Sequence, residues 1–308
     1  MPQPIAQGKD YLTRLFAKDL IDNLYPDNTF YKNSKDDTPF VKGDEVILPH
    51  AGTMPNVVID RETKGTATKR ADIHHKYSIH EFTTDPTWLQ YSEDLLANYP
   101  KRQSILSNDT EALNTAFANY IAIAWAKAKV GATKVIRTSG DVRPTSIGTG
   151  NRKAFTLKDL LAIQKQMNND DIPQEGRFAL ITAQQLADML EIKEVKSSDF
   201  NNGKPLVKGS LGVFLGITFY MRSKTVRFTS TAASIREYGV AGQDTDCAAA
   251  IFWHKNYVRS AKGSNVVFLE KGKVEHYGDL MSCLTRFGGT HSRKDGKGVY
   301  NLVEATAA

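Results

Sequence analysis

The sequence predicts a protein of the α+β class, with one long helix, one long hairpin and a strand-rich C-terminal part. Three observations carry this prediction. Apolar residues recur at helical spacing over about 107–130, and two β-like runs enclose a polar stretch within 44–82. Short apolar runs separated by turn residues then fill the C-terminal part of the chain. At 308 residues the chain can bury a large core, in one elaborate domain or in two ordinary ones.

The first 43 residues are expected to form an arm that leads into the hairpin. Large apolar residues between Asp10 and Tyr25 fall on one side of a helix that ends before Pro26 and needs a surface to lie on. The stretch MPQPIAQGKDYL has no basic segment followed by an apolar one, so it indicates no secretion signal. We therefore expect synthesis in a cytoplasm.

Residues 44–82 predict a long hairpin with a charged tip. Its β-like runs are Glu45 to Leu48 and Ile73 to Phe82. A two-stranded ribbon buries too little to be stable alone in water, so the hairpin should lean on another surface, which in an assembling protein is a neighbouring subunit. The charged residues expected at this subunit interface are Asp60, Arg61, Glu62, Lys64, Lys69 and Arg70.

Residues 84–99 are expected to form a turn and a short helical stretch, and the longest helix follows them. Asn108 and Glu111 stand in capping-box register, and apolar residues recur at helical spacing until Gly131. At 1.5 Å per residue this helix would span roughly 30 Å or more, which is enough to brace a whole domain.

A helix, a turn, a strand and a second helix are predicted over 157–190. The first helix ends at an Asn-Asn-Asp-Asp cluster before Pro173, and Gly176 tolerates the positive φ that a tight reversal often needs. A strand at 178–181 follows. Thr182 and the glutamine three residues later then stand in capping-box register at the start of the second helix.

Beyond this unit the pattern is mainly β-like. Residues 197–210 are expected to form a polar loop, and 211–228 and 266–270 are expected to form strands. Residues 248–258 predict a buried strand that enters a short helix. The end of the chain predicts two strands around a reversal, with 295–298 as a hairpin turn.

Basic charge is concentrated in one stretch, residues 127–153. The net charge of +6 is too small by itself to indicate a dedicated nucleic-acid binder, but in this stretch only Asp141 opposes the bases. The stretch should face phosphate or a neighbouring acidic surface, or else form a solvated basic loop. The bases of this candidate DNA-facing cluster are Lys127, Lys129, Lys134, Arg137, Arg143, Arg152 and Lys153.

The sequence predicts no catalytic, cofactor or metal site. On an extended strand His74 and His80 lie about 20 Å apart, too far to share an ion. Asp244 and Asp246, near His254, lack any catalytic spacing and indicate a turn. The two cysteines indicate no disulfide framework, and no apolar run approaches the ~20 residues of a membrane span. We therefore expect neither an enzyme nor a membrane protein.

The order of these elements resembles the HK97-type fold of the major capsid proteins of tailed bacteriophages. The resemblance also rests on short motifs: the Pro173-x-x-Gly176-Arg177 unit, AAAIFWHKNYVRSA at 248–261, Tyr277-Gly278-Asp279, Phe287-Gly288-Gly289 and the Asp-Gly-Lys-Gly-Val run at 295–299. By this resemblance the chain divides into an N-terminal arm and lead-in at 1–43, an E-loop hairpin at 44–82, a peripheral domain with a spine helix at 83–177, an axial domain at 178–265, and C-terminal strands returning to the peripheral domain at 266–308.

The resemblance implies a major capsid protein that self-assembles as hexamers and pentamers into an icosahedral shell around double-stranded DNA. The implied partners are further copies of the chain, a portal protein and packaged DNA held by non-specific contact, with no cofactor. Because the hairpin begins near residue 44, a short arm and a separate scaffolding protein are expected. The implied location is the virion capsid, assembled in the host cytoplasm. Two alternatives stay open: an encapsulin-like nanocompartment shell, and a DNA-binding oligomer that uses the 127–153 cluster.

Overall fold

The computed structural model describes most of the chain, and three of the predicted segments lie outside it. These segments are the N-terminal arm helix, the greater part of 84–99 and the polar loop at 197–210. The described residues are 25–52, 56–65, 67, 69–90, 101–127, 135–192, 212–230, 234–293 and 295–307.

A seven-stranded mixed sheet forms the centre of the molecule, in the order β10-β11-β9-β13-β16-β6, with β12 paired to β13. Strand β13 is buried along its whole length and enters the 3-10 turn η4, which confirms the buried strand predicted at 248–258. The strands are β6 (Val135–Arg137), β9 (Arg177–Thr182), β10 (Val213–Phe214), β11 (Ile217–Arg222), β12 (Val226–Phe228), β13 (Cys247–His254) and β16 (Val299–Val303), and η4 is Lys255–Tyr257.

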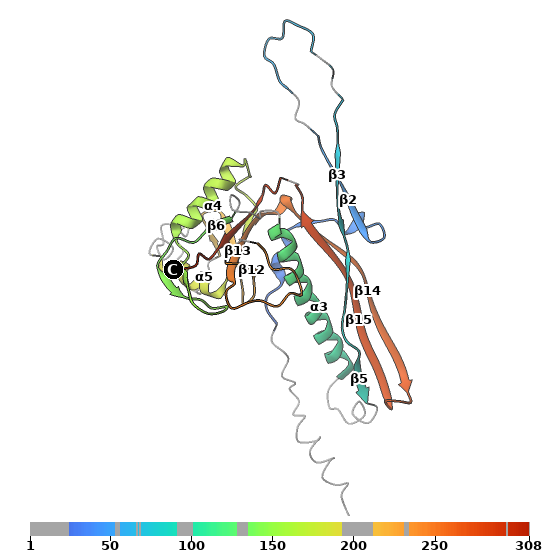
Figure 1. Ribbon diagram of the computed structural model, residues 1–308. Helices are drawn as coiled ribbons and strands as arrows, with labels where there is room; N and C mark the ends of the chain where they lie inside the picture. The colour runs from blue at the N-terminus through green and yellow to red at the C-terminus, as the bar shows by residue number, and fades with distance from the viewer. Residues whose placement is uncertain are drawn as a thin grey trace, which may run out of the picture.

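Both faces of this sheet are covered because β13 is apolar on both sides. Ile251 and Trp253 pack on one face against the long helix α3 (Lys101–Ala126). Phe252 points to the other face, toward α4 (Leu157–Asn169) and α5 (Ala183–Glu191). Alternation along a strand places successive side chains on opposite faces, so one strand serves two cores. In Figure 1 the green helix α3 and the yellow-green α4 lie on either side of the orange strand β13.

A second, elongated sheet runs along the far side of α3 (Figure 1). Its order is β1-β14-β15-β4, with β5 also paired to β15. Phe117 of α3 stacks on Phe287 of β15 with 4.1 Å between the ring centroids, so the core on this face of the central sheet extends across α3 to the elongated sheet. The strands are β1 (Lys35–Asp36), β4 (His80–Thr83), β5 (Thr87–Gln90), β14 (Val258–Lys273) and β15 (Gly278–His291).

The predicted hairpin is confirmed. Strand β2 (Glu45–His50) pairs antiparallel with β3 (Ile73–Ser78), and the connecting residues stand away from the body of the molecule (Figure 1). The second run is divided at Ile79, because β4 leaves the hairpin and pairs with β15. The lead-in to the hairpin contains two short 3-10 helices, η1 (Thr29–Lys32) and η2 (Thr38–Phe40). A separate small antiparallel pair is formed by β7 (Val142–Pro144) and β8 (Asn151–Lys153).

Two helix predictions around this region are wrong. Over Thr87–Gln90, the described part of the predicted helical stretch, the chain forms strand β5 instead, since Leu89 is buried and Trp88 is exposed in the alternation of a strand. The long helix α3 already includes Lys101, so Asn108 lies in its interior instead of capping it. Cap-type residues cost only a few tenths of a kcal/mol in a helix interior, which tertiary packing overrides.

The unit predicted over 157–190 is confirmed in detail. Gly176 has φ +81° between α4 and β9. Thr182 caps α5, with its hydroxyl accepting from the Gln185 backbone N–H at 3.1 Å while the Gln185 side chain accepts from the Thr182 N–H at 3.0 Å. This reciprocal pair is the capping box that the spacing indicates.

The last predicted turn is wrong, and the strands of one sheet come from several of the predicted domain ranges. Residues 295–298 do not close a hairpin, because β15 and β16 belong to different sheets. The central sheet takes β6, β9 and β16 from the three ranges predicted as 83–177, 178–265 and 266–308, and β14 crosses the boundary at 265. Sheet membership is set by long-range pairing, which local sequence does not encode.

Candidate assembly surfaces

The base of the hairpin is fixed to the elongated sheet by a buried carboxylate. Asp37 has no exposed surface, and its Oδ1 accepts from Arg259 Nη1 at 2.6 Å on β14. Its Oδ2 accepts from the Tyr77 hydroxyl at 3.1 Å on β3. Burial and the neighbouring Asp37 charge raise the pKa of Tyr77, so this phenol stays a donor. One side chain therefore links the lead-in segment, the hairpin and β14.

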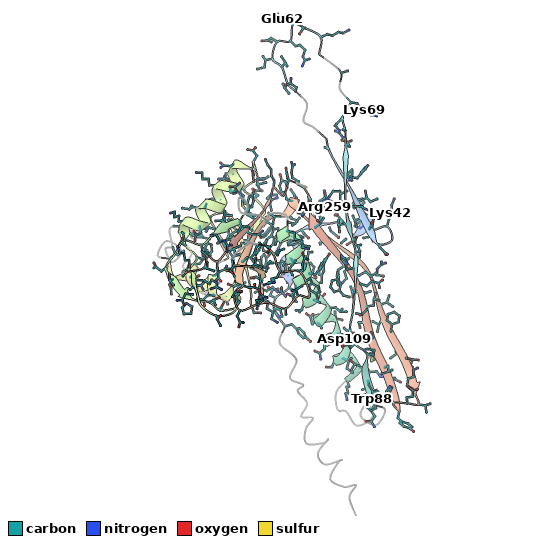
Figure 2. The ribbon with its side chains drawn as sticks, in the orientation of Figure 1. Lys42, Glu62, Lys69, Trp88, Asp109 and Arg259 are labelled. Atoms are coloured by element: carbon teal, nitrogen blue, oxygen red, sulfur yellow. The ribbon has the colours of Figure 1, made fainter. Side chains whose placement is uncertain are left out.

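Apolar packing and surface ion pairs strengthen the same base. Val46, Leu48, Tyr77 and Ile79 form a small core with Ala261 of β14. Around its edge Lys76 binds Glu45 at 3.0 Å, and Arg286 binds Asp44. The hairpin is thus held firmly at one end, which gives its other end a defined direction (Figure 2).

The far end of the hairpin is exposed and carries a stretch of apolar residues that the sequence analysis missed. Val57 is 83% exposed and Ile59 is 85% exposed, with Val58 between them. Contiguous exposed apolar side chains mark interaction surfaces in soluble proteins. The apolar run is visible in the sequence as PNVVID, but the hairpin tip was interpreted from the charged residues that follow this run.

The predicted charged tip residues lie at this same end, where Figure 2 labels Glu62 and Lys69. Arg70 forms a bidentate pair with Asp72 at 2.7 and 2.9 Å, and Asp72 also accepts from the Gly52 N–H across the hairpin. This pair closes the paired part of the ribbon. The tip residues described as exposed are Asp60, Arg61, Glu62, Lys64, Lys69 and Arg70.

A second exposed apolar surface lies at the opposite end of the molecule, on the distal part of β14, β15 and β5. Val267 and Phe268 are each 54% exposed, and Trp88, labelled in Figure 2, is 47% exposed. Strand β1 pairs with β14 only at Arg259 and Ser260. The rest of that edge therefore has no paired strand among the described residues. We call this surface the distal ribbon.

The basic cluster predicted over 127–153 is not a solvent-facing group. Arg143 is half-buried and lies between Asp188 and Glu304, at 2.6 and 2.8 Å. Arg152 is 5% exposed and donates to two backbone carbonyls of the chain turn before β13. The prediction of an exposed base is wrong for both, because buried carboxylates and carbonyls of distant segments recruit them.

The other bases of the cluster do not form a shared basic surface either. Arg137 donates to the carbonyls of Glu304 and Ser230, and Lys127 binds Glu237 at 2.6 Å. Lys153 is half-buried. Lys129 and Lys134 lie outside the described residues.

The acidic and histidine side chains near β13 form hydrogen bonds and ion pairs that hold the fold together. Asp246 is buried and holds Arg236 through a bidentate pair at 2.9 and 3.0 Å. The His254 ring is bonded at both nitrogens, to the Glu175 carbonyl at 2.8 Å and to the Asn256 N–H at 3.2 Å. Burial lowers the pKa of His254. Within the described part of the chain no cluster of three metal-ligating side chains occurs, and no helix is long and apolar enough to cross a membrane.

The protein has a projecting hairpin, a long helix between two sheets and exposed apolar surfaces at both ends. These features define its class, because they are arranged as in the HK97-type capsid fold. Residues 108–299 match the family described as phage capsid protein, and because this match covers more than half of the chain, the protein belongs to that family. The search of curated proteins gave no match.

Solved capsid structures confirm the fold over almost the whole chain. The capsid of cyanophage P-SCSP1u is 17% identical with a TM-score of 0.70, covering 95% of this chain and 92% of that one. The structure from Mycobacterium phage Che8 is 13% identical with a TM-score of 0.63, covering 94% of both chains. The capsid of a native GTA particle is 10% identical with a TM-score of 0.62, covering 95% and 94%. At these identities the likeness shows the fold alone.

Proposed function

We propose that copies of this phage capsid protein assemble as hexamers and pentamers into an icosahedral shell that encloses double-stranded DNA. The observation that carries this proposal is that two exposed apolar surfaces lie at opposite ends of the folded molecule. The hairpin tip, which includes the exposed Val57 and Ile59, lies at the end where Figure 2 labels Glu62, and the distal ribbon, which includes the exposed Val267 and Phe268, lies at the end where it labels Trp88.

Such a placement suits contacts between different surfaces of successive copies. If the tip of one copy rests on the distal ribbon of the next, the contact is heterologous, and repeated rotation closes it into a ring. Both partners are apolar, so the contact removes surface that would otherwise face water. Many modest contacts of this kind add up to a stable shell.

The rigid base supports this role for the hairpin. A ribbon of two strands is marginal alone, but here Asp37, Arg259 and Tyr77 fix its root to the elongated sheet. In this proposal residues 44–82 are the E-loop and α3 is the spine helix. The central sheet with α5 corresponds to the axial domain, and the elongated sheet to the peripheral domain.

The remaining partners also belong to the proposal. A portal protein, a separate scaffolding protein and assembly in the host cytoplasm follow from the resemblance to tailed-phage coats. Non-specific contact with DNA through the 127–153 stretch loses its support, because Arg143 and Arg152 are engaged inside the subunit.

Electron microscopy tests the proposal. The full chain is expressed alone and with its neighbouring genes, and each sample is examined by negative stain and by sedimentation. We expect closed polyhedral shells or rings of six and five copies, with nucleic acid inside particles from an infection. A small oligomer of uniform size under every condition would contradict shell assembly, and particles filled with a protein cargo would contradict genome enclosure.

A further inference from the structure

A cavity of about 310 Å³ lies between α3, the turn joining β11 to β12, and the loop before β13. It is separate from both apolar ends and from the base of the hairpin. From α3 it is lined by Asn119, Ala122 and Ile123, and from the loop by Tyr238 and Val240 among others. The assembly contacts proposed above make no use of this cavity.

The charges around the cavity do not balance. Four cationic side chains line it and one carboxylate, Glu237, does. Glu237 is already bound to Lys127 at 2.6 Å, so it neutralises none of the four. Arg236 has its own partner in the buried Asp246. The three cations left are Arg222, Lys224 and Arg227.

Arg222 carries the clearest sign of a missing anion. It is 2% exposed, and Nη1 donates to Asn119 Oδ1 at 2.9 Å, whereas Nε and Nη2 are buried without a hydrogen-bond partner in the described structure. Burying charged donors without acceptors is costly. Burial accordingly lowers the pKa of Arg222 to about 10, while the charge of Asp27 acts in the opposite direction, and Arg222 stays charged at neutral pH.

The edge of Arg222 that has no acceptor among the residues that the structure describes is formed by Nε and Nη2. Other arginines of this chain bind carboxylates through this same edge. Arg143, Arg236 and Arg293 each present Nε and Nη2 together to a carboxylate, at distances between 2.6 and 3.1 Å. This planar fork matches two oxygens of a carboxylate or a phosphate.

Arg227 provides a second cation without a carboxylate of its own. Its charge acts on Asp246, but that carboxylate is held by Arg236. The guanidinium lies against the backbone of Gly242, where an added Cβ would meet Arg227 Nη1 at 2.1 Å. The glycine therefore makes the space in which this cation lies beside the cavity.

We propose that this cavity binds a phosphate group, held by Arg222, Lys224 and Arg227. Lys224 and Ser223 are exposed and form the β11–β12 turn, so a shift of this turn admits the ligand to the covered edge of Arg222. Arg227 and Lys224, which line the same cavity, supply two further positive charges. The phosphate comes either from free inorganic phosphate or from a nucleic-acid backbone.

Titration of the unassembled full-length chain tests the site. Inorganic phosphate is followed by calorimetry at fixed ionic strength, and a short single-stranded deoxyoligonucleotide is followed by fluorescence anisotropy. The variants are Arg222→Lys, which keeps the charge but lacks the fork, Lys224→Gln and Arg227→Gln. Lys158→Gln on α4 is the matched control, since it removes one exposed positive charge away from the cavity.

We expect phosphate to bind and each cavity variant to weaken it by about tenfold or more, while Lys158→Gln binds like the parent chain. Parallel loss of oligonucleotide binding assigns the phosphate to a nucleic-acid backbone, and loss confined to inorganic phosphate assigns it to the free ion. Absence of binding to both probes would overturn the proposal. Equal weakening by Lys158→Gln, Lys224→Gln and Arg227→Gln would overturn it as well, because binding would then follow net charge.

Discussion

Single buried charges decide how segments far apart in the sequence are joined. Asp37 binds Arg259, 222 residues away, and Arg143 binds Glu304, 161 residues away. Removing one partner from a buried pair leaves the other charge uncompensated, which costs far more than losing an exposed pair. These residues were invisible as partners in the sequence, where Arg143 was counted as a free base of a basic stretch.

Replacement of Asp37 measures this coupling. We expect Asp37→Ala to lower the free energy of unfolding by about 3–5 kcal/mol, because Arg259 and the Tyr77 hydroxyl lose their acceptor. Urea unfolding checks the value. The control is Glu45→Gln, which breaks an exposed pair with Lys76 and should cost at most about 1 kcal/mol. Equal costs for the two variants would show that the Asp37 cluster does not anchor the hairpin.

His254 predicts a dependence of stability on pH. Burial lowers its pKa in the folded state below the ordinary value of 6.5, so the unfolded chain takes up a proton first as the pH falls. The free energy of unfolding should therefore decrease below about pH 6.5 and reach its full loss beneath the folded-state pKa. Urea unfolding at pH 7.5 and pH 5.5 should show a smaller decrease in His254→Gln than in the parent. His74→Gln replaces an exposed histidine and is the control. If the free energy of unfolding decreases as much in His254→Gln as in His74→Gln and the parent, His254 is not the source of the pH dependence.

Elements whose signals are local were predictable from the sequence. The α4-turn-β9-α5 unit was predicted because its stop, its glycine turn and its capping box all lie within a few residues of each other. Strand β5 and the start of α3 were not, because pairing with β15 and packing on two sheets decide them. The sheets themselves join strands that are far apart in sequence, so local pattern could not give their order.

The capping box gives a prediction at this scale. Thr182→Ala removes the hydroxyl that accepts from the Gln185 N–H, and we expect a loss of about 1 kcal/mol in the free energy of unfolding. Thr182→Ser keeps the acceptor and should retain most of that stability. Thermal or urea unfolding of the three proteins makes the comparison. If the serine variant loses as much as the alanine variant, packing of the methyl group and not capping stabilises this helix start.

At the scale of the whole molecule, the order of elements was enough to predict the fold, and the match to the phage capsid protein family over 108–299 agrees with it. The surfaces were predicted less well. The charged tip was placed correctly at the end of the hairpin, but the apolar residues beside it were missed, and the basic cluster turned inward. Exposure depends on packing in three dimensions, which composition does not report.

The apolar tip should govern assembly without affecting the subunit. We expect the double variant Val57→Ser with Ile59→Ser to keep the unfolding temperature of the parent, because both side chains are exposed. Its assembly, followed by light scattering and sedimentation velocity, should be slower and less complete. Val142→Ser, at a valine 56% exposed on β7, is the matched control and should assemble normally. Unimpaired assembly of the tip variant would remove the tip from the contact.

The most direct test is a cryo-electron microscopy reconstruction of the assembled particle. We expect a closed icosahedral shell in which Val57 and Ile59 of each copy are buried against the distal ribbon of a neighbouring copy. A shell in which the tip stays in solvent, or folds back onto its own subunit, would contradict assembly through the projecting hairpin.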